Sequence, residues 1–370
     1  MSWSIGSDGK PDELHWREEY TCKTRDNYTL TMQRCLSCTE QGTIIEPIHN
    51  HAVILCHGFA SNRFTFDLDT DVSVVNYLAD IGWDTWLIEL RGSGKNNDIA
   101  ANKQTSVVRT SDWLDNWKNT SGISANPGEH RHDWDFSDHV EDCRAVVEYV
   151  NLITSRSVHF IGHSMGAMLL QSIAGGESGN KGLIRSGCSI AGAVVMESSH
   201  WSYFKWLWPI VQHFGTIHPE YIQKVLAPLS FNLGDNPWEE LFVYHRNVDP
   251  KVARKLFLKN WEPISIALID QLRFCLEKGG IRKHDGTQYS KNLKFITSPQ
   301  LLVAGTCDQQ CHPVCMETVN KMITGSVYKL IGVKSGHKHE YGHFDLILGK
   351  NAKKEVWDMV SRFMEKNDTV

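Results

Sequence analysis

The sequence predicts an α/β fold, a mostly parallel β-sheet covered by α-helices, and two observations lead to this prediction. First, six short apolar runs, each near a glycine, are separated in several places by helical patterns, as expected of strands buried on both faces. Second, 370 residues with 41% hydrophobic and 22% charged residues suffice for a large core. The six runs are residues 52–56, 83–90, 158–161, 191–196, 300–304 and 327–331.

An antiparallel hairpin and two helices complete the predicted core. Between residues 15 and 35, β-favouring side chains flank the turn-forming cluster Arg25-Asp26-Asn27. One helix has an apolar stripe behind Asp138 and Glu141, which we expect to cap it, and the other closes the chain. The stripe of the first helix is Val140, Cys143, Val146, Val147 and Val150, and that of the second is Val356, Trp357, Val360 and Phe363.

Two insertions interrupt the alternation of strands and helices. Residues 95–133 are polar and too long for an ordinary connection, and residues 200–298 are helix-compatible and aromatic. Each follows a predicted strand end, so we expect both to lie over the edge of the sheet where ligands bind. The predicted organisation is a core of residues 1–199 and 299–370, with 200–298 as a mainly helical cap.

Aromatic residues crowd the start of the predicted cap, where Trp201, Phe204, Trp206 and Trp208 follow one another closely. Packing inside the cap is the first interpretation, and a wall of the substrate site is the second. A membrane-docking surface is the third. On the second interpretation, Trp201, Phe204 and Trp208 contact the substrate.

Charge and composition exclude several classes of function. The net charge is −5 and no long basic block is present, so a nucleic-acid partner is not expected. No apolar run approaches the 18 or so residues that span a bilayer. The N-terminal stretch has no secretory signal pattern, which predicts a cytoplasmic protein with ten reduced cysteines. Neither Cys35 with Cys38 nor the set Cys307, Cys311 and Cys315 has a second pair at zinc-ligand spacing, so no metal site is expected.

The chemistry is indicated by the stretch Gly162-His163-Ser164-Met165-Gly166, which follows an apolar run and precedes a good helix start. This is the G-x-S-x-G pattern of a nucleophile elbow, a strand-to-helix turn that exposes the serine hydroxyl above the sheet edge. The helix start also directs the Met165 N–H toward developing negative charge. A similar tripeptide, Gly187-Cys188-Ser189, is rejected because we expect it to precede a strand.

Three further parts occur in the chain order that such a site needs. His57-Gly58-Phe59 follows a strand and offers a second backbone donor, with the N–H of Phe59 preferred to that of Ala60. Asp308 follows a late strand, where its carboxylate can hold an imidazole tautomer. His343 follows the last strand, on a loop above the same edge.

With these parts in place, the sequence resembles the α/β-hydrolase family of serine hydrolases over roughly residues 50–365, the two insertions excepted. The stretches HGFASNRFTFDLD, WDTWLIELRGSG, DWDFSDHVEDC, GHSMG and YGHFDLILG are most similar to the neutral and acid lipases and related uncharacterised hydrolases. The resemblance implies a triad of Ser164 as nucleophile, His343 as base and acid, and Asp308 as its orienting carboxylate. It also implies an oxyanion hole formed by Phe59 and Met165.

Alternatives remain for two of these roles. His337 and His339 compete with His343, and Glu197 competes with Asp308 as the acid. His57 and His163 flank the expected site, and we expect them to pack and donate hydrogen bonds there rather than to act as bases.

Two neighbouring features have plainer interpretations. The sequence Arg91-Gly92-Ser93-Gly94 lacks the lysine and the spacing of a phosphate loop and is interpreted as a turn. Cys307 is expected to be a small buried hydrophobe.

The function expected from this constellation is cleavage of a carboxylic ester with a hydrophobic or lipid-like portion, without a metal or organic cofactor. An acyltransferase with an alcohol or amine acceptor is the alternative, because the same triad serves both reactions. A non-catalytic protein that binds a hydrophobic ligand is the third possibility. Peripheral membrane contact and the oligomeric state stay open.

Overall fold

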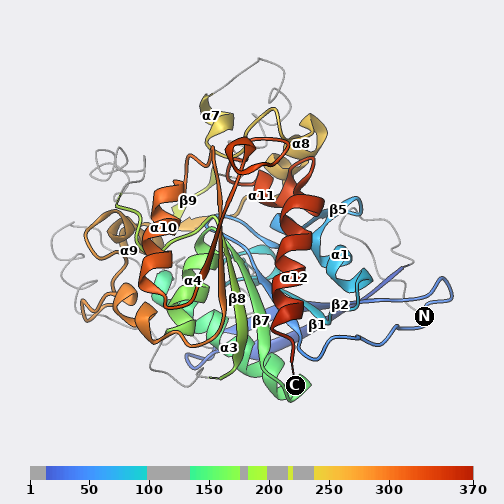
Figure 1. Ribbon diagram of the computed structural model, residues 1–370. Coiled ribbons are helices and arrows are strands. Elements are labelled where there is room, and N and C mark those ends of the chain that lie inside the picture. The colour runs from blue at the N-terminus through green and yellow to red at the C-terminus, as the bar shows by residue number, and fades with distance from the viewer. Residues whose placement is uncertain (1–13, 98–133, 176–181, 198–215, 220–236, 370) are drawn as a thin grey trace.

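The computed structural model describes residues 14–97, 134–175, 182–197, 216–219 and 237–369, and it contains an eight-stranded sheet (Figure 1). The strand order is β1-β2-β6-β3-β7-β8-β11-β12. β1 pairs antiparallel with β2 and β2 with β6, and every later pairing is parallel. The strands are β1 (His15–Lys23), β2 (Thr29–Ser37), β3 (Val53–Cys56), β6 (Thr85–Ile88), β7 (Val158–His163), β8 (Ile184–Ile190), β11 (Gln300–Gly305) and β12 (Val327–Ile331). The α/β prediction and the N-terminal hairpin are confirmed.

Helices cover both faces of this sheet (Figure 1). The core on one face is built with α3 (Phe136–Thr154), α4 (Met165–Ala174) and α10 (Pro313–Met322). The core on the other face is built with α1 (Val74–Asp80) and α12 (Asp358–Lys366). Strands with helices on both faces become fully buried, which explains their continuous apolar runs.

Shorter elements lie mainly beyond the carboxyl ends of the strands or in the connections. They are β4 (Asp67–Asp69), β5 (Val72–Ser73), β9 (Thr216–Ile217), β10 (Ile264–Ser265), α7 (Pro237–Glu240), α8 (Pro250–Lys259), α9 (Ile266–Leu272) and α11 (Asp345–Leu348). Short 3-10 segments span Arg63–Thr65, Gly94–Asn97, Arg273–Leu276, Tyr289–Phe295 and Val333–Ser335, and a π-helical turn, Lys353–Trp357, leads into α12. In the described part of the chain, no helix combines the length and apolarity needed to cross a membrane.

The described part of residues 200–298 contains α7, α8 and α9 together with one short antiparallel pair, β9 with β10. That content fits a mainly helical insertion, and the division of the chain into core and cap stays a prediction. Most of the predicted insertion 95–133 lies outside the described residues.

One predicted strand is wrong. Residues 191–196 are not a strand; β8 occupies residues 184–190, and the tripeptide Gly187-Cys188-Ser189 lies inside it. Small polar residues fit this central strand because their hydroxyls have partners. Ser186 hydrogen-bonds His159, and Ser189 accepts a hydrogen bond from Gln171. The apolar run after β8 is buried irregular chain instead.

Two smaller expectations also need correction. β12 is not buried on both faces, because it lies at the edge of the sheet, where Val327 remains 40% exposed. The cap of α3 lies one turn earlier than expected: Asp135 and Asp138 form a capping box, each carboxylate accepting the other's backbone N–H. Glu141 instead pairs with Arg144 on the helix surface.

Candidate active site

Ser164 occupies the turn between β7 and α4, with backbone angles φ 55° and ψ −122°. A positive φ is unfavourable for a residue with a side chain, so the surrounding packing must hold this turn in place. A Cβ on Gly162 would lie 2.3 Å from the Gly166 carbonyl oxygen, and one on Gly166 would lie 2.2 Å from that of Cys56. Only glycine fits at either position. The predicted nucleophile elbow is therefore present in the backbone.

The backbone of Gly58 lies directly against the Ser164 side chain. A Cβ added to Gly58 would lie 2.7 Å from Ser164 Cβ and 3.2 Å from its Oγ. Met165, the first residue of α4, follows the serine. The structure thus brings the predicted His-Gly turn and the start of α4 to the same serine, which is where two oxyanion donors are needed.

Residues that follow α8 hydrogen-bond to the turn after β3. The Ala60 carbonyl accepts a hydrogen bond from Glu262 N at 3.0 Å. Asn260 donates to Ser61 Oγ through its amide and accepts from Thr65 Oγ1 at 3.1 Å. Residues about 200 positions apart therefore set the path of the chain that follows Phe59.

His57 keeps this turn in shape. Its Nε2 accepts a hydrogen bond from Leu90 N at 3.2 Å, so its Nδ1 carries the hydrogen and donates to the Gly58 carbonyl at 3.0 Å. Burial lowers the pKa of His57 to about 4, which leaves the ring neutral. Both ring nitrogens are engaged by backbone groups, in agreement with the structural role expected for this histidine.

Asp308 and His343 form a buried pair. His343 Nδ1 lies 3.0 Å from Asp308 Oδ2 and 3.1 Å from Oδ1, and each residue is 2% exposed. Asp308 Oδ1 also accepts hydrogen bonds from Gln310 N at 2.8 Å and Cys311 N at 2.9 Å. Asp308 follows β11, and those backbone donors fix its carboxylate in one orientation toward the imidazole.

The alternative candidates for the acid and the base do not contact the Asp308–His343 pair. Glu197 is exposed and accepts a hydrogen bond from Gly279 N at 3.0 Å. His337 hydrogen-bonds the backbone of Gly332, and His339 is half-exposed on the same loop. Within the described ranges, His343 is the histidine that contacts Asp308.

His163 connects the elbow to the loop of His343. Its Nε2 donates to the His343 carbonyl oxygen at 3.1 Å, and the two ring centroids are 4.8 Å apart. Burial, followed by the nearby His343, lowers the pKa of His163 well below its usual range. A neutral ring packed beneath His343 positions it and does not compete with it as a base.

Asp345 is a buried carboxyl group that sequence reasoning missed. It accepts hydrogen bonds from Gly342 N at 2.8 Å, Tyr244 N at 3.1 Å and the Asn247 amide at 3.3 Å. Burial raises the pKa of Asp345 to about 7. Asp345 therefore ties the loop that carries His343 to a segment about 100 residues earlier. The only local signal was its position two residues after His343.

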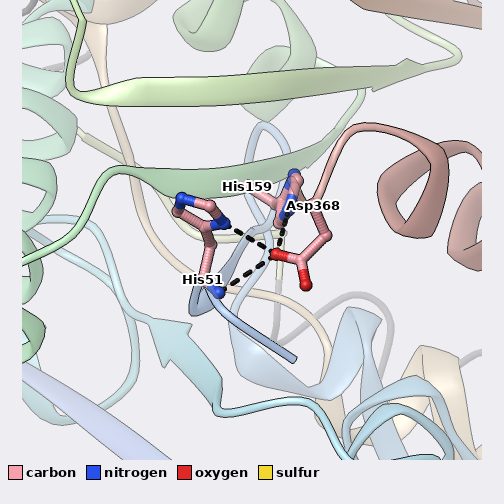
Figure 2. Close-up of side chains that lie close together, drawn as sticks. All are labelled: His51, His159 and Asp368. Carbon is pink, nitrogen blue, oxygen red and sulfur yellow. Dashed lines mark hydrogen bonds and ion pairs between the residues drawn. The ribbon is translucent and has the colours of Figure 1, made fainter. Parts of the chain in front are cut away.

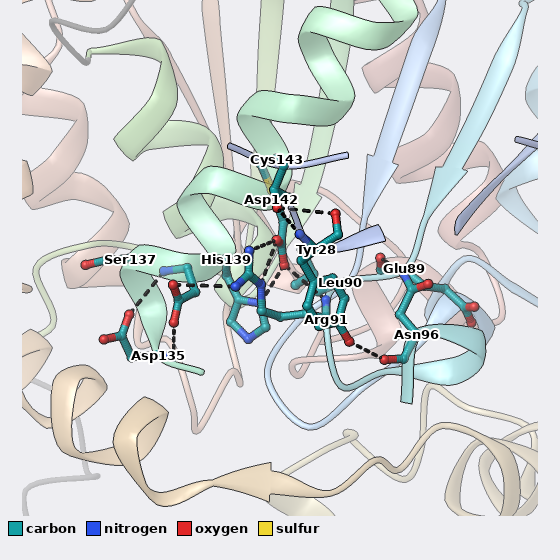
Figure 3. A network of polar contacts seen from close by, with 12 residues as sticks. Tyr28, Glu89, Leu90, Arg91, Asn96, Asp135, Ser137, His139, Asp142 and Cys143 are labelled. Atoms are coloured by element: carbon teal, nitrogen blue, oxygen red, sulfur yellow. Dashed lines mark hydrogen bonds and ion pairs between the residues drawn. The ribbon is translucent and has the colours of Figure 1, made fainter. Parts of the chain in front are cut away.

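Arg91 was also missed as an organising residue (Figure 3). Its guanidinium donates to Asp142 Oδ1 at 2.8 Å and to Asp26 Oδ2 at 2.8 Å, and lies 4.8 Å from the Tyr28 ring centroid. Its backbone N–H donates to Asp142 as well. Leu90, the preceding residue, donates to His57. The network thus joins the N-terminal hairpin and α3 to the strand end that supports the His-Gly turn.

The ten cysteines, all in the described part of the chain, are thiols outside any disulfide. Burial raises the pKa of Cys307 and, more strongly, that of Cys311. Cys307 is half-buried rather than buried as expected, and because a thiol with a raised pKa is a poor nucleophile, no nucleophilic role is indicated for it. Trp201, Phe204 and Trp208 lie outside the described residues.

Comparisons with known proteins agree with this fold. The family model for the alpha/beta hydrolase fold matches residues 51–337. An esterase from Thermogutta terrifontis superposes with a TM-score of 0.55 at 14% identity, over 95% of this chain and 100% of its own. A monoacylglycerol lipase from Paleococcus ferrophilus superposes with a TM-score of 0.54 at 12% identity, over 95% and 98%. No curated protein sequence matches. Because the family model covers more than half of its length, the chain belongs to the α/β-hydrolase fold family.

Proposed function

We propose that this protein is a serine hydrolase that cleaves carboxylic esters, with Ser164, His343 and Asp308 as its catalytic triad. The observation that carries the proposal is the buried Asp308–His343 pair, 3.0 Å apart, at the same sheet edge as the strained turn of Ser164. The esterase and the lipase named above have the same fold, which supports this class of reaction.

The roles of the triad residues follow from the hydrogen bonds that their side chains already make. His343 Nδ1 is held by Asp308, so its Nε2 takes the proton from Ser164 Oγ as that oxygen attacks the ester carbonyl. The backbone N–H groups of Phe59 and Met165 stabilise the oxyanion, each contributing about 3–4 kcal/mol to the transition state. His343 then protonates the leaving alcohol, and water repeats the cycle on the acyl-enzyme.

The substrate that we propose has a hydrophobic acyl or alcohol portion. Its support is the aromatic crowding at residues 201–208 of the sequence, where Trp201, Phe204 and Trp208 would form one wall of the site. Esters are small-molecule partners, and the reaction needs no metal or organic cofactor.

A panel of p-nitrophenyl esters from two to sixteen acyl carbons tests the proposal, with the Ser164→Ala variant as control. The expected result is hydrolysis that favours medium or long chains and disappears in the variant. Activity confined to short, soluble esters would contradict the hydrophobic substrate and leave the triad standing. An acylated product formed from added glycerol, in place of free acid, would instead identify an acyltransferase.

A further inference from the structure

Three titratable side chains meet at the amino ends of the parallel strands, away from Ser164 (Figure 2). His51 precedes β3, His159 is the second residue of β7, and Asp368 follows α12. One ligand atom from each lies within 4.8 Å of the others. Their exposed fractions are 7%, 0% and 8%, so all three are buried.

Two of the distances in this cluster are near those between ligands of one metal ion, and all three ligand atoms lie within 4.8 Å of one another. His51 Nδ1 is 2.7 Å and His159 Nε2 is 3.3 Å from the same oxygen, Asp368 Oδ1. With zinc bonds of about 2.0–2.1 Å in a tetrahedral site, neighbouring ligand atoms are about 3.3 Å apart. The His159 distance already matches that value, and His51 needs to move by about 0.6 Å.

The surroundings orient each ligand as outer partners do in metalloproteins. His159 Nδ1 hydrogen-bonds Ser186 Oγ at 2.7 Å, which leaves Nε2 toward the centre. Asp368 Oδ2 accepts a hydrogen bond from Asn50 N at 2.7 Å, so the second carboxylate oxygen is occupied. Oδ1 faces the two imidazoles and also accepts a hydrogen bond from His51 N at 3.1 Å.

A cation at this cluster would bind deprotonated imidazole nitrogens and an ionised carboxylate. Arg185, which donates to the Asn367 carbonyl at 2.6 Å, adds a positive charge that weakens the site.

We propose that His51 Nδ1, His159 Nε2 and Asp368 Oδ1 bind one divalent transition-metal ion, Zn²⁺ in the first place, with water as the fourth ligand. Two imidazoles and one carboxylate select Zn²⁺ over Mg²⁺ or Ca²⁺, which prefer oxygen ligands. On binding, the proton of His51 moves from Nδ1 to Nε2, and that of His159 moves from Nε2 to Nδ1, which then donates to Ser186 Oγ. The bound ion would link the C-terminal residues to the sheet. Because the cluster and Ser164 lie at opposite ends of β7, the role of the ion is structural rather than catalytic.

The test uses the full chain without a histidine tag, treated with EDTA and dialysed. Titration with Co²⁺ should give visible d–d absorption that saturates at one ion per chain, and added Zn²⁺ should abolish it. Zn²⁺ should also raise the melting temperature of the protein. A wild-type protein that binds neither ion at about 100 μM overturns the proposal, and the cluster is then a hydrogen-bonded latch.

Variants identify the ligands. Asp368→Asn keeps the size of the side chain and removes its negative charge and should weaken Co²⁺ binding more than about 100-fold, whereas Ser186→Ala should weaken it about 10–100-fold. His337→Ala, on a distant half-exposed loop, is the matched control and should bind normally. Unchanged binding in Asp368→Asn, or equal loss in His337→Ala, overturns the assignment. Circular dichroism confirms folding, and the wild-type titration decides the proposal if a variant does not fold.

Discussion

Replacing Asp308 by asparagine changes one partner of the His343 ring and leaves the shape of the turn after β11 unchanged. Oδ1 accepts the N–H groups of Gln310 and Cys311, so the amide oxygen of asparagine must occupy that position. The amide NH₂ then takes the place of Oδ2, 3.0 Å from His343 Nδ1. The amide oxygen stays 3.1 Å from Nδ1, but a hydrogen on Nδ1 would also face the NH₂ group at 3.0 Å, so the tautomer with Nδ1 as acceptor and the hydrogen on Nε2 is favoured.

A hydrogen on Nε2 prevents His343 from taking the proton of Ser164. The same tautomer error in a serine protease lowers kcat about 10⁴-fold, which corresponds to about 5 kcal/mol of transition-state free energy. We expect a loss of that size in kcat/KM for p-nitrophenyl butyrate in Asp308→Asn. The melting temperature should change little, because the backbone hydrogen bonds of the turn are retained.

Glu197→Gln is the matched control for this prediction. Glu197 is exposed and its carboxylate accepts only the Gly279 N–H among the contacts described, so its loss should change kcat/KM by less than about twofold. Retention of more than a tenth of the activity in Asp308→Asn would refute the reasoning. A large loss in Glu197→Gln would transfer the acidic role to that residue.

Three further predictions concern the supports of the site. Gly58→Ala places a methyl group 2.7 Å from Ser164 Cβ, displaces the oxyanion turn, and should lower kcat about 10²–10³-fold in steady-state assays; unchanged kcat would contradict this oxyanion hole. Asp345, with a pKa raised to about 7, stabilises the fold most below pH 4, so the free energy of unfolding should fall by about 2–4 kcal/mol between pH 4 and 8. Asp345→Asn should lose that contribution in urea titrations, leaving the part due to Asp138, whose pKa burial also raises to about 7; a slope identical to that of the wild-type protein would contradict the assignment. Arg91→Met leaves Asp142 buried without its cation and should cost about 3–5 kcal/mol in urea unfolding, and a loss below about 1 kcal/mol would contradict the network's structural role.

The parts of the site that the sequence predicts are those with local signals. The elbow is recognisable because the turn at Ser164 requires Gly162 and Gly166, which leave a pattern within five residues. Asp308 and His343 are predictable because parallel strands end at one sheet edge, so residues after different strands meet there. Their contact is described by the structure, and their catalytic roles stay proposals.

The parts that sequence reasoning missed depend on distant partners. Asp345 is held by Tyr244 and Asn247, and no pattern around it records those donors. The strand β8 was not predicted because its sequence contains serines and a glycine instead of a continuous apolar run. Its two buried serine hydroxyls are accommodated because they hydrogen-bond to His159 and Gln171. Hydrophobic periodicity predicts which segments are buried; it does not show how buried polar groups are satisfied.

The central claim is that Ser164 is an activated nucleophile, and intact-mass labelling with a fluorophosphonate probe tests it most directly. The account predicts one adduct per chain in the wild-type protein, none in Ser164→Ala, and slower labelling in His343→Ala. A folded wild-type protein that takes up no probe, or an adduct that persists in Ser164→Ala, would contradict it.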